Sequence, residues 1–357
     1  MIKKTPFYSN HISLGAKMVD YAGFSMPIYY KGINVEHNHV RKSVGIFDVS
    51  HMGQVIVEGK DSCVFLQKIT TNNVSKLTIG KVQYSCITNK KGGVLDDLLV
   101  YKLSKEKYML VVNASNTDKI INWMSKHNKY GLDITNVTSK KGLIALQGPK
   151  ALSLLQKITN YDLSNISYYS FDFIDLLEGE NIIVSATGYT GAGGFEIYAD
   201  KEMIQKIWNQ LFNIKDLDLL PIGLGARDTL RMEMGYCLYG NEINEETSPL
   251  EAGLSWIVDL KKNFIGSDFL KKENIKKKII GFELEEKGIP RKGYDIVNQG
   301  GNKIGYVTSG TMSPFLNKAI GIGFIYEKVL IDNFFILIRN RKIKANLVKF
   351  PFVKNNI

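Results

Sequence analysis

The amino-acid sequence predicts an α+β protein built from two pseudo-duplicated α+β lobes and a C-terminal β-barrel. With 357 residues, 44% of them hydrophobic, the chain is too long for a single hydrophobic core. One order of strands and helices occurs twice at an offset of 89 residues, and only short strands follow the lysine-rich run 271–278. These observations favour two related lobes and a third, all-β domain.

The first lobe begins with alternating residues at 54–59, typical of a strand, and residues 61–69 carry apolar side chains at helical spacing. A helix over 117–127, with Asn116 or Thr117 as its N-cap, closes this lobe. Three strands are expected between these helices, and residues 90–93 join the first two as a hairpin turn. The expected strands are 82–88, 94–103 and 107–113.

The second lobe repeats this order. Its expected elements are strand 142–147, helix 149–158, strands near 168–174, 181–187 and 194–199, and helix 201–212. The pentapeptide LQKIT occurs at 66–70 and again at 155–159, and Gly59 matches Gly148. We infer an internal duplication, with two lobes around a pseudo-two-fold axis and a ligand cleft between them.

The sequence after residue 222 no longer follows the repeated order of the two lobes. A further helix starts near Gly223, and the run 271–278 is interpreted as a solvated connector. The barrel strands are expected at 279–285, 320–325, 334–338 and 345–350, with a hairpin at Gly300 and Gly301.

Composition narrows the class of protein. The net charge of +11 fits nucleic acid, anionic lipid or an acidic partner, but the lysines are scattered and no nucleic-acid-binding motif occurs. A genome rich in A and T explains a Lys-, Asn- and Ile-heavy chain; attraction to an acidic carrier or a polyanionic cofactor tail is the functional alternative. Without a signal peptide or an apolar stretch of membrane-helix length, we expect a cytoplasmic protein. Cys63, Cys86 and Cys237 form no ligand cluster, so we expect neither a disulfide nor a metal.

Two adjacent carboxylates stand out in strand 94–103. Since side chains alternate along a strand, Asp96 and Asp97 point to opposite faces, and one of them meets an apolar surface. A desolvated carboxylate has a raised pKa and suits proton transfer near neutrality. Alternatively, one aspartate stabilises the turn after Gly93 and the other is solvated. The pattern leaves both points open.

A glycine-rich loop, 187–194, leads into a strand that carries Glu196 and Tyr198 on one face. Its glycines complete neither a P-loop nor a dinucleotide-binding motif, so nucleotide binding is unsupported. Glu196 could accept paired N–H donors from a flat heterocycle such as a pterin, or form a salt bridge at the strand end.

Arg227 and Arg231 are four residues apart on the helix that starts near Gly223. In a chain that otherwise uses lysine, two neighbouring arginines suggest bidentate donation to carboxylates. The alternative is an internal ion-pair network with Asp228, Glu233 or Glu251.

The histidines give a weaker signal. His51 is more typical of a buried core or turn position than of a catalyst, and His37 with His39 lacks a third metal ligand.

Taken together, these segments resemble the glycine cleavage T-protein family over essentially the whole chain. The resemblance rests on residues 14–23 (LGAKMVDYAG), 47–53 (FDVSHMG), 92–98 (GGVLDDL), 188–196 (GYTGAGGFE), 223–231 (GLGARDTLR) and 253–256 (GLSW). It implies a three-domain cloverleaf with two ferredoxin-like lobes around a central folate cleft. The implied domains are 1–53 with 140–240 (the folate site), 54–139 with 241–275 (the catalytic aspartate) and 276–357 (the barrel).

The resemblance also implies roles for residues. Asp97 would be catalytic, Glu196 would bind the pterin and Arg227 would belong to the folate site. The other residues implied to line this site are Tyr84, Tyr101, Asn113, Tyr168, Tyr189 and Met52. The sequence departs from the family at Phe24, where tryptophan is usual, and at Ala186, where arginine is common.

The implied activity is aminomethyl transfer with tetrahydrofolate and a lipoylated carrier, the H-protein. Within the same fold, the alternative is a non-enzymatic folate-binding relative that assists iron–sulfur assembly or RNA modification. That relative carries a Lys-Gly-Cys-Tyr segment, whereas residues 262–266 here read KNFIG and lack the cysteine.

Overall fold

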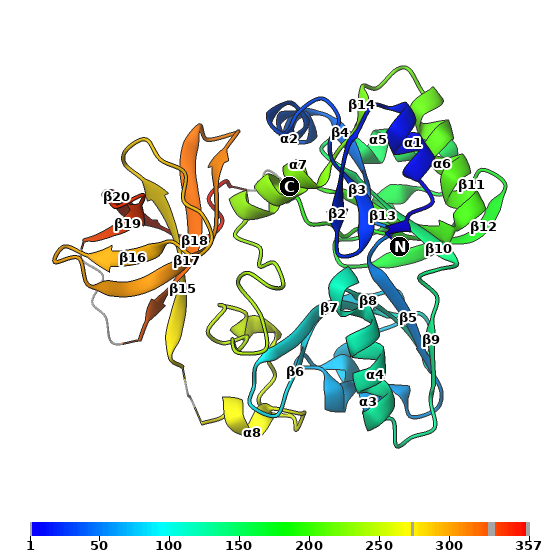
Figure 1. Cartoon of the computed structure of the whole chain (residues 1–357). Coiled ribbons are helices and arrows are strands. Elements are labelled where there is room, and N and C mark those ends of the chain that lie inside the picture. Colours follow the sequence, from blue (N-terminus) through cyan, green and yellow to red (C-terminus); the bar gives the residue numbers. More distant parts are fainter. Residues whose placement is uncertain (1, 273–274, 328–332, 355–357) are drawn as a thin grey trace.

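The computed structural model describes residues 2–272, 275–327 and 333–354 (Figure 1). A six-stranded sheet, in the order β11-β12-β13-β10-β4-β14, forms one lobe. Its strands are β4 (Val44–Asp48), β10 (Lys141–Gln147), β11 (Phe171–Leu176), β12 (Gly179–Ser185), β13 (Gly194–Asp200) and β14 (Leu219–Pro221). Helices α5 (Ala151–Leu155) and α6 (Lys201–Asn213) cover one face, where Trp208 and Leu154 are buried in a common core.

A five-stranded sheet, in the order β6-β7-β8-β5-β9, forms the other lobe. Its strands are β5 (Gly53–Glu58), β6 (Val82–Thr88), β7 (Val94–Lys102), β8 (Lys107–Val112) and β9 (Asp133–Asn136). Helices α3 (Ser62–Ile69) and α4 (Thr117–His127) pack on its outer face through buried side chains such as Phe65 and Ile120.

The strand orders confirm the internal duplication. β6-β7-β8-β5 corresponds to β11-β12-β13-β10 in both sheet order and chain order, and the helices α3 and α4 correspond to α5 and α6. The next strand differs, since β9 follows α4 in the chain whereas β4 precedes β10. The matched glycines keep the same unusual backbone, because Gly59 has φ +138° and Gly148 has φ +127°. The inner faces of the two sheets share a third core, to which Tyr101 and Val111 contribute from one lobe and Phe47 and Tyr198 from the other.

The first 43 residues were not resolved into elements by sequence pattern. They form a small sheet and two helices: β1 (Lys3–Lys4), α1 (Tyr8–Ser13), β2 (Lys17–Tyr21), β3 (Phe24–Tyr29) and α2 (Ile33–Lys42). Helix α7 (Leu224–Glu233), the helix expected near Gly223, packs against α2 and β3. The buried Glu36 carboxylate accepts hydrogen bonds from the backbone N–H groups of Tyr30, Lys31, Gly32 and Gly223, and so joins these segments.

The C-terminal barrel is also confirmed. It closes in the order β15-β18-β17-β16-β19-β20, and Gly301 (φ +86°) lies in the turn between β16 and β17. Its strands are β15 (Lys277–Leu284), β16 (Asp295–Asn298), β17 (Lys303–Ser313), β18 (Lys318–Tyr326), β19 (Phe334–Ile338) and β20 (Arg341–Val348). Figure 1 shows the barrel and the two lobes arranged around α7 and the loops that follow it; these loops carry the short helices η5 (Ser255–Ile257) and α8 (Ser267–Leu270). None of the helices within the described ranges has the length and apolar character needed to cross a bilayer.

Candidate active site

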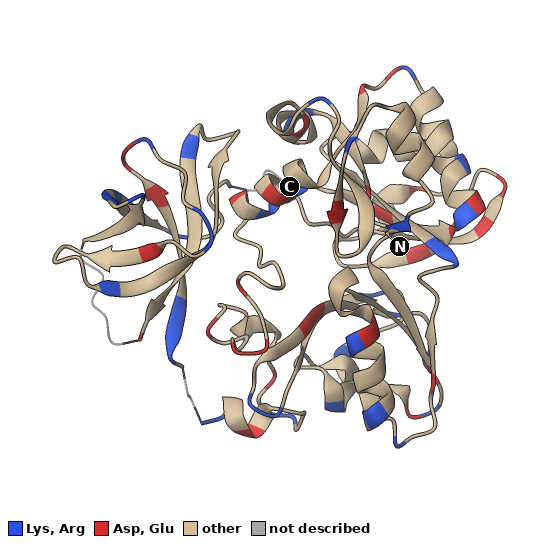
Figure 2. Ribbon diagram, in the orientation of Figure 1, with Lys and Arg blue, Asp and Glu red and all other residues tan. Residues whose placement is uncertain are grey.

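The adjacent carboxylates lie on β7, where a red band marks them in Figure 2. Asp96 shares its face with Leu98 and Val100, which belong to the core beneath α3 and α4. Asp97 lies on the opposite face with Tyr101, which belongs to the core between the two sheets. Asp96 is fully buried and Asp97 is half-buried. Tertiary packing therefore makes Asp97 the carboxylate that a ligand between the lobes can reach.

Asp96 is held by amide donors. Its Oδ2 accepts the backbone N–H of Asn113 at 3.0 Å, and its Oδ1 accepts the side-chain amides of Asn113 and Asn116 at 2.9 and 2.6 Å. Asn116 does occupy the N-cap position of α4, but its side chain binds Asp96 and forms no capping hydrogen bond. The hairpin turn before β7 is stabilised by Asn89, so Asp96 fixes the β8–α4 loop instead.

Asp97 is hydrogen-bonded through both oxygens. The Tyr84 hydroxyl donates to Oδ2 at 2.9 Å, and the Asn113 amide donates to Oδ1 at 2.8 Å. Burial raises the pKa of Asp97 above that of an ordinary aspartate, while these two hydrogen bonds oppose the rise. The result is an oriented carboxyl group whose pKa has moved toward the range useful for proton transfer.

Glu196 on β13 faces the same inter-lobe region. Its Oε2 accepts hydrogen bonds from the hydroxyls of Thr187 and Tyr198. The Tyr198 hydroxyl lies 2.8 Å from that of Tyr101, which is buried and also contacts Ser185 and Thr187. Tyr101 thus contacts both residues that donate hydrogen bonds to Glu196, Thr187 and Tyr198. Within the described residues, Oε1 of Glu196 accepts no hydrogen bond, which leaves it available to a donor from a ligand.

Arg227 and Arg231 have different environments although they share α7. The Arg227 guanidinium lies 4.6 Å from the ring centroid of Tyr189 and forms no ion pair with any described residue. Burial raises the pKa of Glu196, and the positive charge of Arg227 counteracts this effect. Arg227 is therefore a half-buried cation near Glu196, without a carboxylate of its own.

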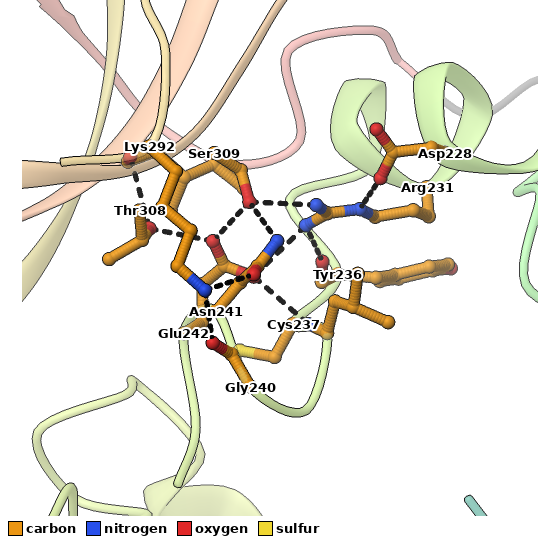
Figure 3. Close-up of polar contacts among 12 residues, drawn as sticks. Asp228, Arg231, Tyr236, Cys237, Gly240, Asn241, Glu242, Lys292, Thr308 and Ser309 are labelled. Atoms are coloured by element: carbon orange, nitrogen blue, oxygen red, sulfur yellow. Dashed lines mark hydrogen bonds and ion pairs between the residues drawn. The ribbon is translucent and has the colours of Figure 1, made fainter. Parts of the chain in front are cut away.

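Arg231 is instead part of the junction with the barrel. It pairs with Asp228 at 2.8 Å and with the buried Glu242 at 3.0 Å, and it donates to the Ser309 hydroxyl of β17 at 2.7 Å. Glu242 in turn accepts hydrogen bonds from Thr308 and Ser309, each at 2.6 Å. Figure 3 shows these side chains meeting between α7 and the barrel. An internal ion-pair network exists as predicted, but for Arg231 alone of the two arginines, and of the three predicted partners only Asp228 takes part. Glu233 pairs with Arg41, and Glu251 accepts hydrogen bonds from Ser248.

Two tyrosines, Tyr84 and Tyr189, lie near the charged groups of the site. The negative charge of Asp97 contributes to raising the pKa of both Tyr84 and Tyr189, after burial as the main cause. Tyr189 lies beneath Arg227 and donates its hydroxyl to the Cys237 carbonyl oxygen. Asp97 is thus hydrogen-bonded to Tyr84 of the five-stranded sheet, and its charge also acts on Tyr189 of the glycine-rich loop.

A cavity of about 380 Å³ opens beside the glycine-rich loop, a size suited to a small organic ligand. Its wall includes Tyr168, Tyr236, Ala186 and Thr187, and all of its lining residues are uncharged. Tyr168 is 64% exposed, and the negative charge of Glu196 contributes to raising its pKa. The cavity thus offers aromatic and backbone groups close to the Glu196 network.

Comparison with known proteins identifies the family of this chain. Residues 7–262 match the family model of the GCVT N-terminal domain, and residues 277–354 match that of the glycine cleavage T-protein C-terminal barrel domain. The chain belongs to the glycine cleavage T-protein family. An aminomethyltransferase of Flavobacterium psychrophilum is 50% identical over 99% of this chain and 100% of that protein. One from Thermosipho melanesiensis is 48% identical over 100% and 98%. The crystal structure of aminomethyltransferase T from Bartonella henselae superposes with a TM-score of 0.92 at 31% identity, covering 99% of both chains.

Met52, His51 and His37, which the sequence also singled out, lie in or beside the packed core. Met52 is partly buried against the core between the sheets. His51 is buried against Tyr21 and Phe24, and burial lowers its pKa to about 4, so the imidazole is neutral at physiological pH. His37 contacts Thr229 and Glu233 at the edge of α7.

His39 lies next to Asp218 on the surface. Among the described residues, no three His, Cys, Asp or Glu side chains converge as a metal-ligand set.

Sequence reasoning missed several polar partners of this site. Asn116 contacts Asp96 and Tyr236 lines the cavity, although neither lies in a recognisable catalytic motif. Thr187 opens the predicted glycine-rich loop, but its hydrogen bond to Glu196 was not predicted. Only the spacing of Thr187 and Tyr198 around Glu196 could have indicated a shared network. The exposed Trp256 beside Tyr84 was also missed as a feature of the site.

Proposed function

We propose that this protein is the aminomethyltransferase of a glycine cleavage system, a cytoplasmic enzyme that uses tetrahydrofolate and a lipoylated carrier. The observation that carries the proposal is the half-buried Asp97 carboxyl, held by Tyr84 and Asn113 on the face of β7 that also carries Tyr101, whose hydroxyl contacts Tyr198, a hydrogen-bond partner of Glu196. The names of the relatives support the same reaction class.

The proposed reaction transfers one carbon. The carrier presents an aminomethyl group on a dihydrolipoyl sulfur; the carbon loses its bonds to sulfur and to the amino nitrogen and gains bonds to N5 and N10 of tetrahydrofolate. The two N–H hydrogens of the folate end on the released ammonia and on the carrier thiol. The products are 5,10-methylenetetrahydrofolate, ammonia and the dihydrolipoyl carrier.

Asp97 orients the attacking folate nitrogen and accepts its proton. Its raised pKa suits this task, and a positioned acid/base group contributes about 10²- to 10⁴-fold to rate. Asn113 and Tyr84 hold the carboxyl plane by hydrogen bonds to different oxygens, which reduces the freedom it would lose on reaching the transition state.

Glu196 and Arg227 bind the folate in this proposal. The free Oε1 of Glu196 accepts from the amino and ring N–H edge of the pterin, and Arg227 supplies bidentate donors near Tyr189. Tyr168 of the uncharged cavity, with Met52 and Tyr101 as supporting side chains, completes the site. The folate-site domain would comprise 1–53 with 140–240, and the domain with Asp97 would comprise 54–139 with 241–275.

The carrier is the H-protein in this proposal, and the barrel supplies charge for its recognition. Residues 276–357 contain 15 Lys and Arg and 6 Asp and Glu, so +9 of the net charge of +11 lies in this region. Figure 2 shows several of these cations along the barrel strands. A surface of this sign attracts an acidic carrier, and its attraction weakens as salt is added.

The test is turnover of the purified protein with tetrahydrofolate and aminomethyl-loaded lipoyl carrier, with ammonia and methylenetetrahydrofolate measured together. Equal amounts of both products, lost in Asp97→Asn although folate still binds, support the proposal. If folate binds but neither product forms with a competent carrier, a non-enzymatic folate-binding role becomes the better account.

A further inference from the structure

One aromatic side chain next to the site is unusually exposed. Trp256 is 66% exposed, although its neighbours Leu254 and Ile257 are buried in the core between β6 and the 237–258 segment. The exposure is therefore a property of this side chain, since the segment that carries it is well packed. An indole is large and mostly apolar, so its exposure leaves a considerable apolar area available to a partner.

Trp256 packs against Tyr84, which is hydrogen-bonded to the Asp97 carboxyl. Its ring lies 5.8 Å from that of Tyr84, measured between centroids, and the Tyr84 hydroxyl donates to Asp97 at 2.9 Å. Tyr84 and Asp97 are both half-buried. A chain of contacts thus begins at the exposed Trp256 ring, continues through Tyr84 and ends at the Asp97 carboxyl.

Trp256 lies on a different element from the groups that bind folate in the proposed function, and Tyr84, which the resemblance also implied for the folate site, contacts both Trp256 and Asp97. Glu196, Arg227 and Tyr189 come from β13, α7 and the glycine-rich loop, whereas Tyr84 and Trp256 come from β6 and η5. Asp97 accepts the hydrogen bond of Tyr84 from the second set, and its charge contributes, after burial, to raising the pKa of Tyr189 in the first set. Two reactants must meet at this carboxyl, and each set of residues offers a surface to one of them.

We propose that Trp256 is the positioning residue for the lipoyl arm of the carrier, packing on its methylene chain while the aminomethyl end reaches Asp97. This inference rests on the proposed function. A lipoyl-lysine arm is a long chain of methylene groups, which gains free energy by leaving water for an indole face.

The kinetic test compares Trp256→Ala and Trp256→Phe with the wild type. We expect Trp256→Ala to raise KM for the loaded lipoyl carrier about tenfold, with kcat and KM for tetrahydrofolate changed less than twofold, and Trp256→Phe to recover most of the loss. Trp123→Phe on α4, which packs on His127 away from Asp97, is the matched control.

A fluorescence titration separates the arm from the body of the carrier. Trp256 is far more exposed than the buried Trp208, so we expect lipoylated carrier to change the emission of the wild type but not that of Trp256→Phe. Carrier lacking the lipoyl group should have little effect.

The inference is overturned by an unchanged KM for the carrier in Trp256→Ala, by an increase confined to KM for tetrahydrofolate, or by an equal response to carrier without lipoate. These outcomes all require an active wild type. An inactive wild type with competent substrates instead contradicts the proposed function, so the two failures are distinguishable.

Discussion

The hydrogen bond from Tyr84 to Asp97 gives a sharp prediction about pH dependence. It favours the ionised carboxylate, so its removal in Tyr84→Phe raises the pKa of Asp97 further. A hydrogen bond to a charged group contributes about 1.5–3 kcal/mol, and about 1.4 kcal/mol corresponds to one pKa unit. Since Asp97 is half-buried, water recovers part of the loss, and we expect a change of about one pKa unit.

The assay is the pH profile of kcat/KM for coupled release of ammonia and methylenetetrahydrofolate between about pH 5 and 9. Because the reaction needs the ionised carboxylate, activity is lost as pH falls through the pKa of Asp97, and Tyr84→Phe should move this acid limb upward by about one pH unit. Tyr108→Phe is the matched control, since Tyr108 is buried on the α3 and α4 side of β8. An acid limb that stays in place, or moves to lower pH, refutes the assignment of Asp97 as the titrating base.

Three further predictions address binding and stability. Arg227→Lys should raise KM for tetrahydrofolate about tenfold, because an ammonium cannot replace planar bidentate donors; an unchanged KM would remove Arg227 from the folate site. Gly194→Ala should abolish folate binding measured by calorimetry, since its Cβ would lie 2.1 Å from the backbone oxygen of Leu146. Gly193→Ala is the control: it has open space around it and should cost only about 1–2 kcal/mol of backbone strain. Arg231→Met should lower the thermal unfolding temperature and cost about 3–5 kcal/mol, because it leaves the Glu242 carboxylate buried and unpaired; an unchanged unfolding temperature would contradict the proposed role of this junction.

Local patterns were sufficient for most elements of the fold. Period-two and helical spacing predicted the strands and helices of both lobes, and the repeated order, with LQKIT at 66–70 and 155–159, predicted the duplication that the matching sheet orders confirm. For β16 and β17 only the hairpin turn between them was predicted. The buried strand β4, the short edge strands β9 and β14 and the segment before residue 43 were not predicted. Their backbone pairing and packing depend on partners far away in the sequence, such as β4 for β14.

The candidate site was predicted in part. Asp97, Glu196 and Arg227 lie in motifs, and the resemblance to the family selected them. Alternation along a strand states only that Asp96 and Asp97 face opposite ways. Asp96 became the buried one because Asn113 and Asn116 supply three amide donors to it, and neither residue carries a signal for this role.

The sequence by itself therefore determined the duplicated α+β architecture, the barrel and the motifs that carry the chemistry, since these depend on residue order and periodicity. Only the tertiary structure decided that Arg231 pairs with Glu242 and donates to Ser309, while Arg227 has no ion-pair partner among the residues that the structure describes. It also decided that Trp256 remains exposed beside Tyr84. The physical reason is that the burial and charge pairing of a side chain depend on groups brought together by the fold. For Arg231 one of these groups is 78 residues away, where no local pattern can indicate it.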